Sequence, residues 1–187
     1  MNFFLKIFLI CFSIFIFGCE QKEYVKDFKV EGIAVGDSLL TYFSKEDILK
    51  NTKYTTVTGE AIDPNEKYLE AQFSNYQFET YQGLQAYYER GDDKFIIHGI
   101  GGGIFYGYDA EKCNNKFNEV KLILKEQFTT PNISEDKNKK ETREGYGDTT
   151  YNALFLDFEN GESIEVVCTD FDNDLLQVAD VFQLSIF

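Results

Sequence analysis

The segment that decides the fold is Lys94-Phe95-Ile96-Ile97-His98-Gly99-Ile100-Gly101-Gly102-Gly103-Ile104-Phe105-Tyr106. It follows a strand-like run over residues 81–90 and the turn signal Gly91-Asp92-Asp93, so the two runs predict a long antiparallel hairpin. Side chains alternate along a strand, so one face is expected to carry Ile96, His98, Ile100, Gly102 and Ile104. The glycines suggest a strand that bends, bulges or passes close under a helix.

The segments after this hairpin predict one helix and further strands. Apolar residues recur every three or four positions over 113–128, which is typical of an amphipathic helix. Residues 129–149 contain many charges and are expected to form an exposed loop. The runs 151–158 and 163–169 flank an Asn-Gly pair, a strong hairpin signal, and 176–187 predicts a last strand.

The segments before the hairpin predict two short helical pieces. Asp37 is a candidate N-cap for a piece that contains Leu39, Leu40 and Phe43. Ser44 is a candidate start for a second piece that ends near Lys50. The order helix, strands, helix, strands predicts an α+β fold, an antiparallel sheet with two main helices packed on one side. We expect a single domain over residues 32–187.

The N-terminus has the features of an export signal. Lys6 precedes an apolar run over residues 7–17, which is too short to span a bilayer. The run ends Ile16-Phe17-Gly18-Cys19, which resembles the bacterial lipoprotein signal, with an aliphatic residue at −3, a small residue at −1 and Cys at +1. This resemblance implies a signal peptide over 1–18, a lipid-bearing Cys19 and a tether over 19–31. An uncleaved anchor or a secreted protein cleaved elsewhere are the alternatives.

Composition and the resemblance together predict the compartment. The formal charge of −14 excludes a general affinity for nucleic acid. By the sorting rule of lipoproteins, Glu20 at +2 favours the outer membrane, facing the periplasm, over the inner membrane. We expect the lipid anchor to hold the protein on the membrane of the bacterial cell envelope.

Two cysteines remain after Cys11 leaves with the signal and Cys19 takes lipid. Cys113 and Cys168 would stand in an oxidising compartment, where two cysteines most simply pair. Two separate buried thiols are the alternative. A zinc site is not expected, because two Cys and one His fall short of four ligands.

Candidate catalytic residues are few. His98 is the only His, and no spacing provides the partner that would orient a general base, so an enzyme is the third hypothesis. The glycine-rich stretch matches no nucleotide-binding motif. Residues 170–174 resemble the start of a calcium loop, but Leu175 and Val181 stand where it needs Gly and Glu. We therefore expect no catalytic residue, no metal and no cofactor.

Tyrosine is abundant around the central hairpin. Rings with one apolar and one polar end suit interfaces and sugar-binding surfaces. A possible binding surface consists of Tyr81, Tyr87, Tyr88, Tyr106 and Tyr108. The first hypothesis is a non-catalytic protein-binding or assembly module that contacts another envelope protein. The alternative is a small-ligand or glycan-binding lipoprotein.

The stretch Gly32-Ile33-Ala34-Val35-Gly36-Asp37, followed by a helical pattern behind a lipidated Cys, is similar to the start of small outer-membrane lipoproteins of the BamE/SmpA-OmlA type. Members of that family fold as helices packed on an antiparallel sheet and scaffold a machine that inserts barrel proteins. The resemblance covers about the first third of the mature chain. It implies the architecture and no binding residues.

Overall fold

The computed structural model describes residues 25, 28–54, 63–74, 76–142, 145–172, 174 and 180–187. Within them the strands form one seven-stranded antiparallel sheet in the order β1-β2-β3-β7-β6-β5-β4. The helices are a 3-10 turn η2 (Leu39–Thr41), α2 (Lys45–Asn51) and α3 (Ala110–Gln127). The strands are β1 (Tyr68–Phe73), β2 (Gly83–Glu89), β3 (Ile97–Phe105), β4 (Asn132–Lys140), β5 (Thr150–Asp157), β6 (Ser163–Asp170) and β7 (Val181–Ile186).

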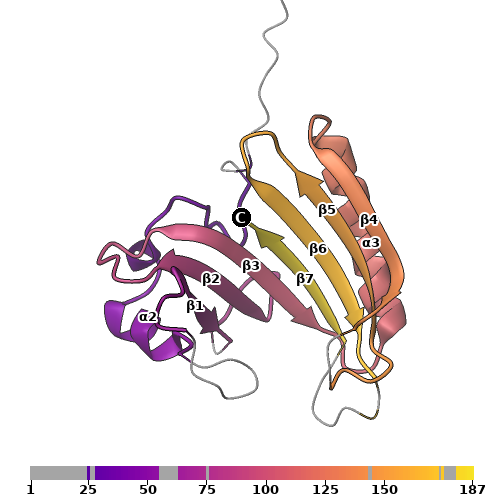
Figure 1. Ribbon diagram of the computed structural model, residues 1–187, viewed down its shortest axis with the longest axis horizontal. Coiled ribbons are helices and arrows are strands. Elements are labelled where there is room, and N and C mark those ends of the chain that lie inside the picture. The colour runs from indigo at the N-terminus through magenta and orange to yellow at the C-terminus, as the bar shows by residue number, and fades with distance from the viewer. Residues whose placement is uncertain are drawn as a thin grey trace, which may run out of the picture.

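The sheet consists of two meanders joined edge to edge. One contains β1, β2 and β3, and the other contains β4 to β7. The β3–β7 pair joins them, with Ile100 opposite Ile186, and α3 connects the end of β3 to the start of β4 (Figure 1). The predicted α+β architecture with an antiparallel sheet and two main helices is therefore confirmed.

One face of the sheet is apolar across six strands. A single row of aligned, fully buried residues crosses it, formed by Ala71, Ala86, Ile100, Ile186, Ile164 and Leu156. Both helices cover this face. Phe43, just before α2, stacks on Phe73 with ring centroids 3.9 Å apart, and Cys113 of α3 forms a disulfide with Cys168 of β6. The sheet therefore has one core face under the helices and one open face.

Local sequence signals explain where the helices begin. Asp109 caps α3 by accepting a hydrogen bond from the Lys112 N–H at 3.0 Å, and Ser44 caps α2 as expected. The first helical piece is shorter than predicted and begins after Ser38, not Asp37. The Asp37 carboxylate instead accepts hydrogen bonds from the Ala34 N–H and the Tyr42 hydroxyl.

Part of the expected tether packs into the domain. Val25 and Val30 are each 1% exposed and belong to the core. The Glu31 carboxylate accepts hydrogen bonds from the backbone N–H groups of residues 79, 80 and 81. Burial alone would raise its pKa, but these three donors hold the pKa of Glu31 below its usual value. The folded domain therefore includes residues before the predicted boundary at 32.

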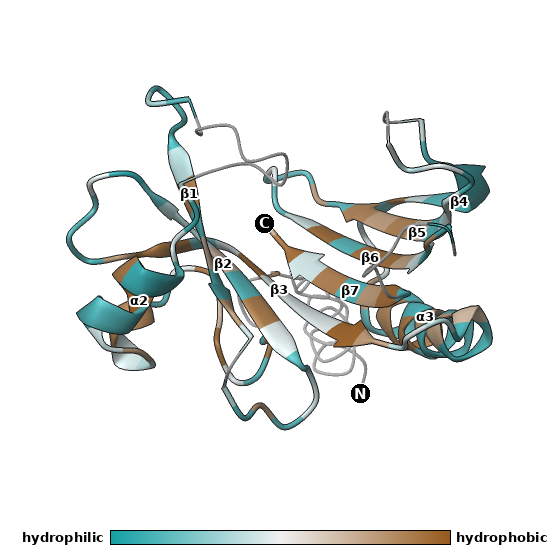
Figure 2. Cartoon of the chain, turned by 90° about the horizontal axis from the view of Figure 1, so that it is seen from below, coloured by the Kyte–Doolittle hydropathy of each residue, from teal (hydrophilic) through white to brown (hydrophobic). Residues whose placement is uncertain are grey.

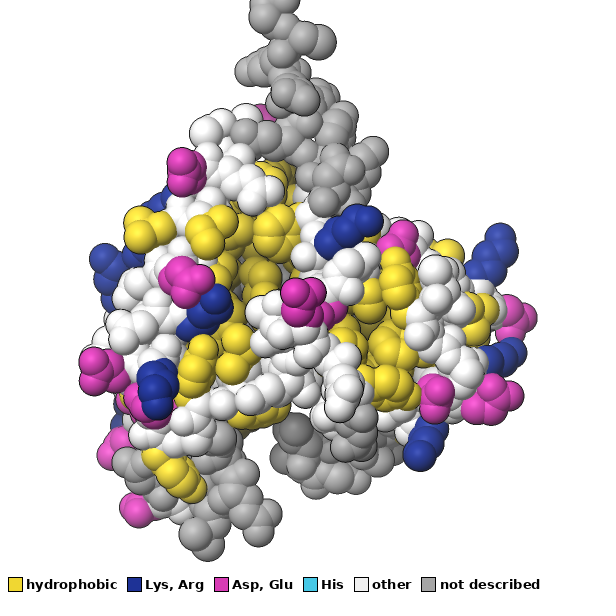
Figure 3. Space-filling view, turned by 180° about the vertical axis from the view of Figure 1, so that it is seen from behind, with side chains coloured by type: hydrophobic (Ala, Val, Ile, Leu, Met, Phe, Trp, Pro, Cys, Tyr) yellow, Lys and Arg dark blue, Asp and Glu magenta, His cyan; other side chains and the backbone are white. Residues whose placement is uncertain are grey.

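The sheet is sharply bent about its centre. Seen from below, the β1–β3 half and the β4–β7 half stand at a steep angle, and both helices lie outside the bend (Figure 2). Because the helices cover the core face and lie outside the bend, the open face of the sheet lies inside it. From behind, on the side where α3 lies, hydrophobic side chains show between the two halves, and charged side chains surround them (Figure 3).

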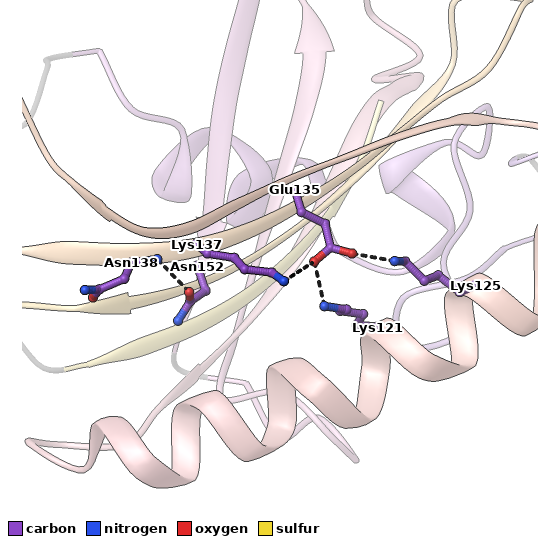
Figure 4. Close-up of polar contacts among 6 residues, drawn as sticks. All are labelled: Lys121, Lys125, Glu135, Lys137, Asn138 and Asn152. Carbon is purple, nitrogen blue, oxygen red and sulfur yellow. Dashed lines mark hydrogen bonds and ion pairs between the residues drawn. The ribbon is translucent and has the colours of Figure 1, made fainter.

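The segment 129–149 is largely exposed, but it contains the edge strand β4. The expectation of a loop misses this strand, because an edge strand with solvent around it needs no apolar alternation. Its pairing with β5 is irregular between Asp136 and Lys139. There the Asn138 N–H donates to the Asn152 side-chain oxygen at 2.8 Å (Figure 4).

An ion-pair cluster fastens β4 to α3. The Glu135 carboxylate contacts Lys121 at 2.6 Å and Lys125 of the helix, with Lys137 of its own strand at 4.0 Å (Figure 4). The Glu135 side chain is 19% exposed. The hydrogen bonds from Lys121 and Lys125 lower the pKa of Glu135 from 4.5 to about 2.

Glu135→Gln is expected to lower the free energy of unfolding at pH 7 by about 1 kcal/mol, because the cluster is near the surface and partly screened. The pKa is depressed in the folded state, so this stabilisation is complete above pH 4.5 and is lost as the pH falls towards 2. Urea titrations of both proteins between pH 7 and pH 2 measure it. A difference that stays constant down to pH 2 would contradict the role of the Glu135 charge.

Candidate functional site

A cleft of about 790 Å³ lies on the open face, between the two halves of the bent sheet. Both meanders line it. Its wall includes Gln72, Gln85, Tyr151, Phe155, Glu165 and Gln183. A concave site with apolar surface and a few placed polar groups is the usual form of a small-molecule site. The helices lie on the other face, so they do not obstruct it.

The glycines of β3 leave the open face of the central strand without side chains at positions 99, 101 and 103. Phe187 and Ser185 occupy the space above Gly99 and Gly101, whereas Gly103 lines the cleft. The Gln183 amide donates to the Gln85 side-chain oxygen at 3.0 Å across the strand. The same amide lies 3.0 Å from the Ser185 hydroxyl oxygen. The floor of the cleft therefore includes bare backbone at Gly103, with the side-chain amides of Gln85 and Gln183 beside it.

A half-buried carboxylate stands in this wall. Glu165 lies between the buried residues Ile164 and Val166 of β6 and faces the open side. It is opposite Ser185 on β7 and Phe155 on β5. Burial raises the pKa of Glu165. Among the described residues, no ion pair includes Glu165, in contrast to the three lysines around Glu135.

Tyr87 stands on the same open face, on β2. Burial, the charge of Glu70 and a hydrogen bond with it, and the charge of Glu165 together raise the pKa of Tyr87 to about 12. Its ring contacts Phe187 with centroids 5.6 Å apart. Glu70 also accepts a hydrogen bond from the Gln72 amide. Tyr87 therefore keeps its proton at neutral pH and adds a hydroxyl to the polar groups of this face.

Aromatic rings form much of the remaining wall. Phe105 of β3 is 51% exposed, and Tyr151 and Phe155 lie on β5. Tyr146 and Phe171 stack at the cleft with ring centroids 6.3 Å apart. These rings offer flat surfaces on which an apolar or cationic group can rest.

His98 lies outside this cleft. A bulge at Tyr87/Tyr88 shifts the register, so that Ile97 rather than Ile96 enters the core beside Tyr88. Strict alternation over 96–104 therefore fails at its start, and His98 is exposed instead of sharing a face with Ile100. Its ring contacts Tyr68, with centroids 5.0 Å apart, in a shallower depression of about 540 Å³.

The five tyrosines of the hairpin do not form one surface. Tyr87 faces the open side, whereas Tyr88 is 2% exposed, and its hydroxyl lies 2.8 Å from that of Thr52 in the core. Tyr81 packs over Gly102 on the core face, Tyr106 is half-buried against the core, and Tyr108 is 63% exposed before α3.

The residues that line the cleft were not predicted as a site from the sequence. Gln85, Gln183, Phe155 and Glu165 stand at the positions that alternate with buried ones, so strand periodicity could place them together on one face. Strand periodicity could not predict that residues of β2 and β6 line the same cleft, because their proximity depends on the β3–β7 pair and on the bend of the sheet.

The expected lipidation site, Cys19, lies outside the residues that the structure describes. Among the residues described, no three Cys, His, Asp or Glu side chains are grouped as a metal site. Within the same part of the chain, no helix has the length and apolar character needed to cross a membrane.

Comparison with protein-family models, with curated proteins and with solved structures gave no match for this chain. The resemblances to bacterial lipoproteins and to the BamE/SmpA-OmlA type therefore stay predictions, and the geometry of the cleft is the basis for a functional proposal.

Proposed function

We propose that this protein is a non-catalytic, lipid-anchored binding protein of the bacterial cell envelope whose cleft holds a small ligand. The observation that carries the proposal is the cleft of about 790 Å³ on the open face of the bent sheet. Its size suits a small molecule, and its lining combines aromatic rings with amide, hydroxyl and carboxylate groups.

The placement of the tyrosines favours this alternative over a protein-binding module. A protein partner needs a continuous surface with aromatic anchors at its centre. Tyr81 and Tyr88 are on the core face and Tyr87 is on the open face, so the predicted surface is divided between two sides of the sheet. A small ligand needs only the groups that meet inside the bend.

Filling the cleft tests the proposal. A side chain at Gly103 would project into the cleft, and its Cβ would meet nothing closer than the Phe182 carbonyl oxygen at 3.9 Å. Gly103→Phe should therefore fold and should weaken ligand binding at least tenfold. The assay is ligand-detected NMR with a library of mono- and disaccharides and small aromatic metabolites, followed by calorimetry on each hit.

Gly103→Ala is the matched control, because a single methyl group leaves most of the cleft open. It should bind each hit as the wild type does, and all three proteins should melt within a few degrees of one another. A library without hits, or hits that bind Gly103→Phe as tightly as the wild type, would overturn the proposal.

The anchor is tested separately. Cys19→Ala should abolish incorporation of labelled palmitate in a bacterial host and should release the protein from the membrane fraction. Five residues separate Cys19 from the buried Val25, a reach of at most about 20 Å, so the anchor would hold the domain next to the bilayer. Unchanged labelling in the variant would refute lipidation at this cysteine.

A further inference from the structure

Among the described residues, the charged side chains that line the cleft are acidic. Glu141 and Glu165 are the charged residues that line it, and Glu66 and Glu70 line the neighbouring depression with His98. Neither lining includes a lysine or arginine among the described residues. A carboxylate or phosphate group placed beside Glu165 would thus be repelled by the charge of that side chain.

Glu165 has the position expected of a counter-charge. It lies in the middle of β6, half-buried, with Phe155 beside it on β5 and the Gln183–Gln85 amide pair across β7 and β3. A carboxylate in such surroundings loses much of its hydration without gaining the ion pairs that Glu135 has. A cation placed against the Glu165 carboxylate would supply the electrostatic stabilisation that the carboxylate loses with its hydration.

The walls suit the rest of a cationic ligand. Positive charge is attracted to the faces of aromatic rings, and Phe155 and Phe105 line the same cleft. The third ring, Tyr151, already has the Lys139 ammonium 5.9 Å from its centroid. An ammonium group can donate hydrogen bonds to the carboxylate and to an amide oxygen, while an attached apolar or aromatic body packs on the rings.

We propose that the ligand of this cleft carries a positively charged amine on an apolar or aromatic body, with the amine bound against Glu165. This inference rests on the proposed function and specifies the class of ligand. It excludes anionic sugars, nucleotides and phospholipid headgroups of net negative charge as occupants.

The test compares three probes of similar shape by calorimetry at pH 7: phenethylamine, 2-phenylethanol and 3-phenylpropionate. Wild-type protein should bind the amine at least tenfold more tightly than the alcohol and should not bind the carboxylate. Glu165→Gln should reduce the advantage of the amine to less than threefold and leave the affinity for the alcohol unchanged. Glu159→Gln, in the exposed turn between β5 and β6, is the matched control and should bind as the wild type does.

The variants distinguish a failure of the cationic assignment from a failure of the proposed ligand-binding function. Equal affinity for amine and alcohol in the wild type, a full amine preference in Glu165→Gln, or no binding of any probe would overturn the cationic assignment. Probe binding that Gly103→Phe abolishes would still support a ligand site in the cleft. Amine binding that survives Gly103→Phe would place the amine elsewhere and contradict this inference. Equal melting temperatures of Glu165→Gln and the wild type establish that the substitution leaves the fold intact.

Discussion

Replacement of both Cys113 and Cys168 by Ala is expected to cost about 4 kcal/mol of unfolding free energy and to lower the melting temperature by about 10 °C. The disulfide joins α3 to β6 across 55 residues of sequence, so its loss restores much freedom to the unfolded chain. Both cysteines are buried, and each Ala also leaves a small cavity. Calorimetry and urea titration of protein exported into an oxidising compartment measure the change.

The single variants provide the control. Either Cys113→Ala or Cys168→Ala already breaks the cross-link, so each should cost nearly as much as the double variant. Reducing agent should shift the melting of the wild type towards that of the double variant and leave the double variant unaffected. Costs that simply add, together with two freely alkylated thiols in the native protein, would show that the pair is not bonded.

The parts of the fold that the sequence predicted depend on local patterns. The helix over 113–128 follows from its apolar spacing, and the hairpin around Gly161 follows from Asn-Gly chemistry and is confirmed by a positive φ of 87°. The disulfide of Cys113 followed from cysteine count and expected compartment. In each case the energy that fixes the element is available within a few residues or from a single covalent pair.

The parts that escaped prediction depend on long-range pairing. The charged strand β4 owes its place to β5 and to the lysines of α3, which lie outside its own sequence. The bulge that turns His98 outward lies where the register between β2 and β3 shifts, opposite Tyr87 and Tyr88 of the neighbouring strand. The cleft needs the β3–β7 pair, which joins segments about eighty residues apart, so no local pattern could reveal Glu165 as part of a site.

Gly102→Ala is expected to destabilise the protein by about 3 kcal/mol, because it would overpack the core face at the centre of the bend. A Cβ at Gly102 would lie only 2.5–2.7 Å from three ring atoms of Tyr81. That ring has little room to move, since the Tyr81 backbone N–H is held by Glu31 at 2.9 Å. Urea titration of the variant should show a lower midpoint with an unchanged slope.

Gly103→Ala, one position along the same strand, is the matched control. The nearest atom to its Cβ would be the Phe182 carbonyl oxygen at 3.9 Å, which is an ordinary contact distance. The free energy of unfolding of this variant should therefore lie within about 0.5 kcal/mol of that of the wild type. In a Tyr81→Ala background the methyl group of Gly102→Ala should become nearly neutral, because the clashing ring is gone. If Gly102→Ala is equally harmful without that ring, the glycine is required by the backbone and not by the ring that packs on it.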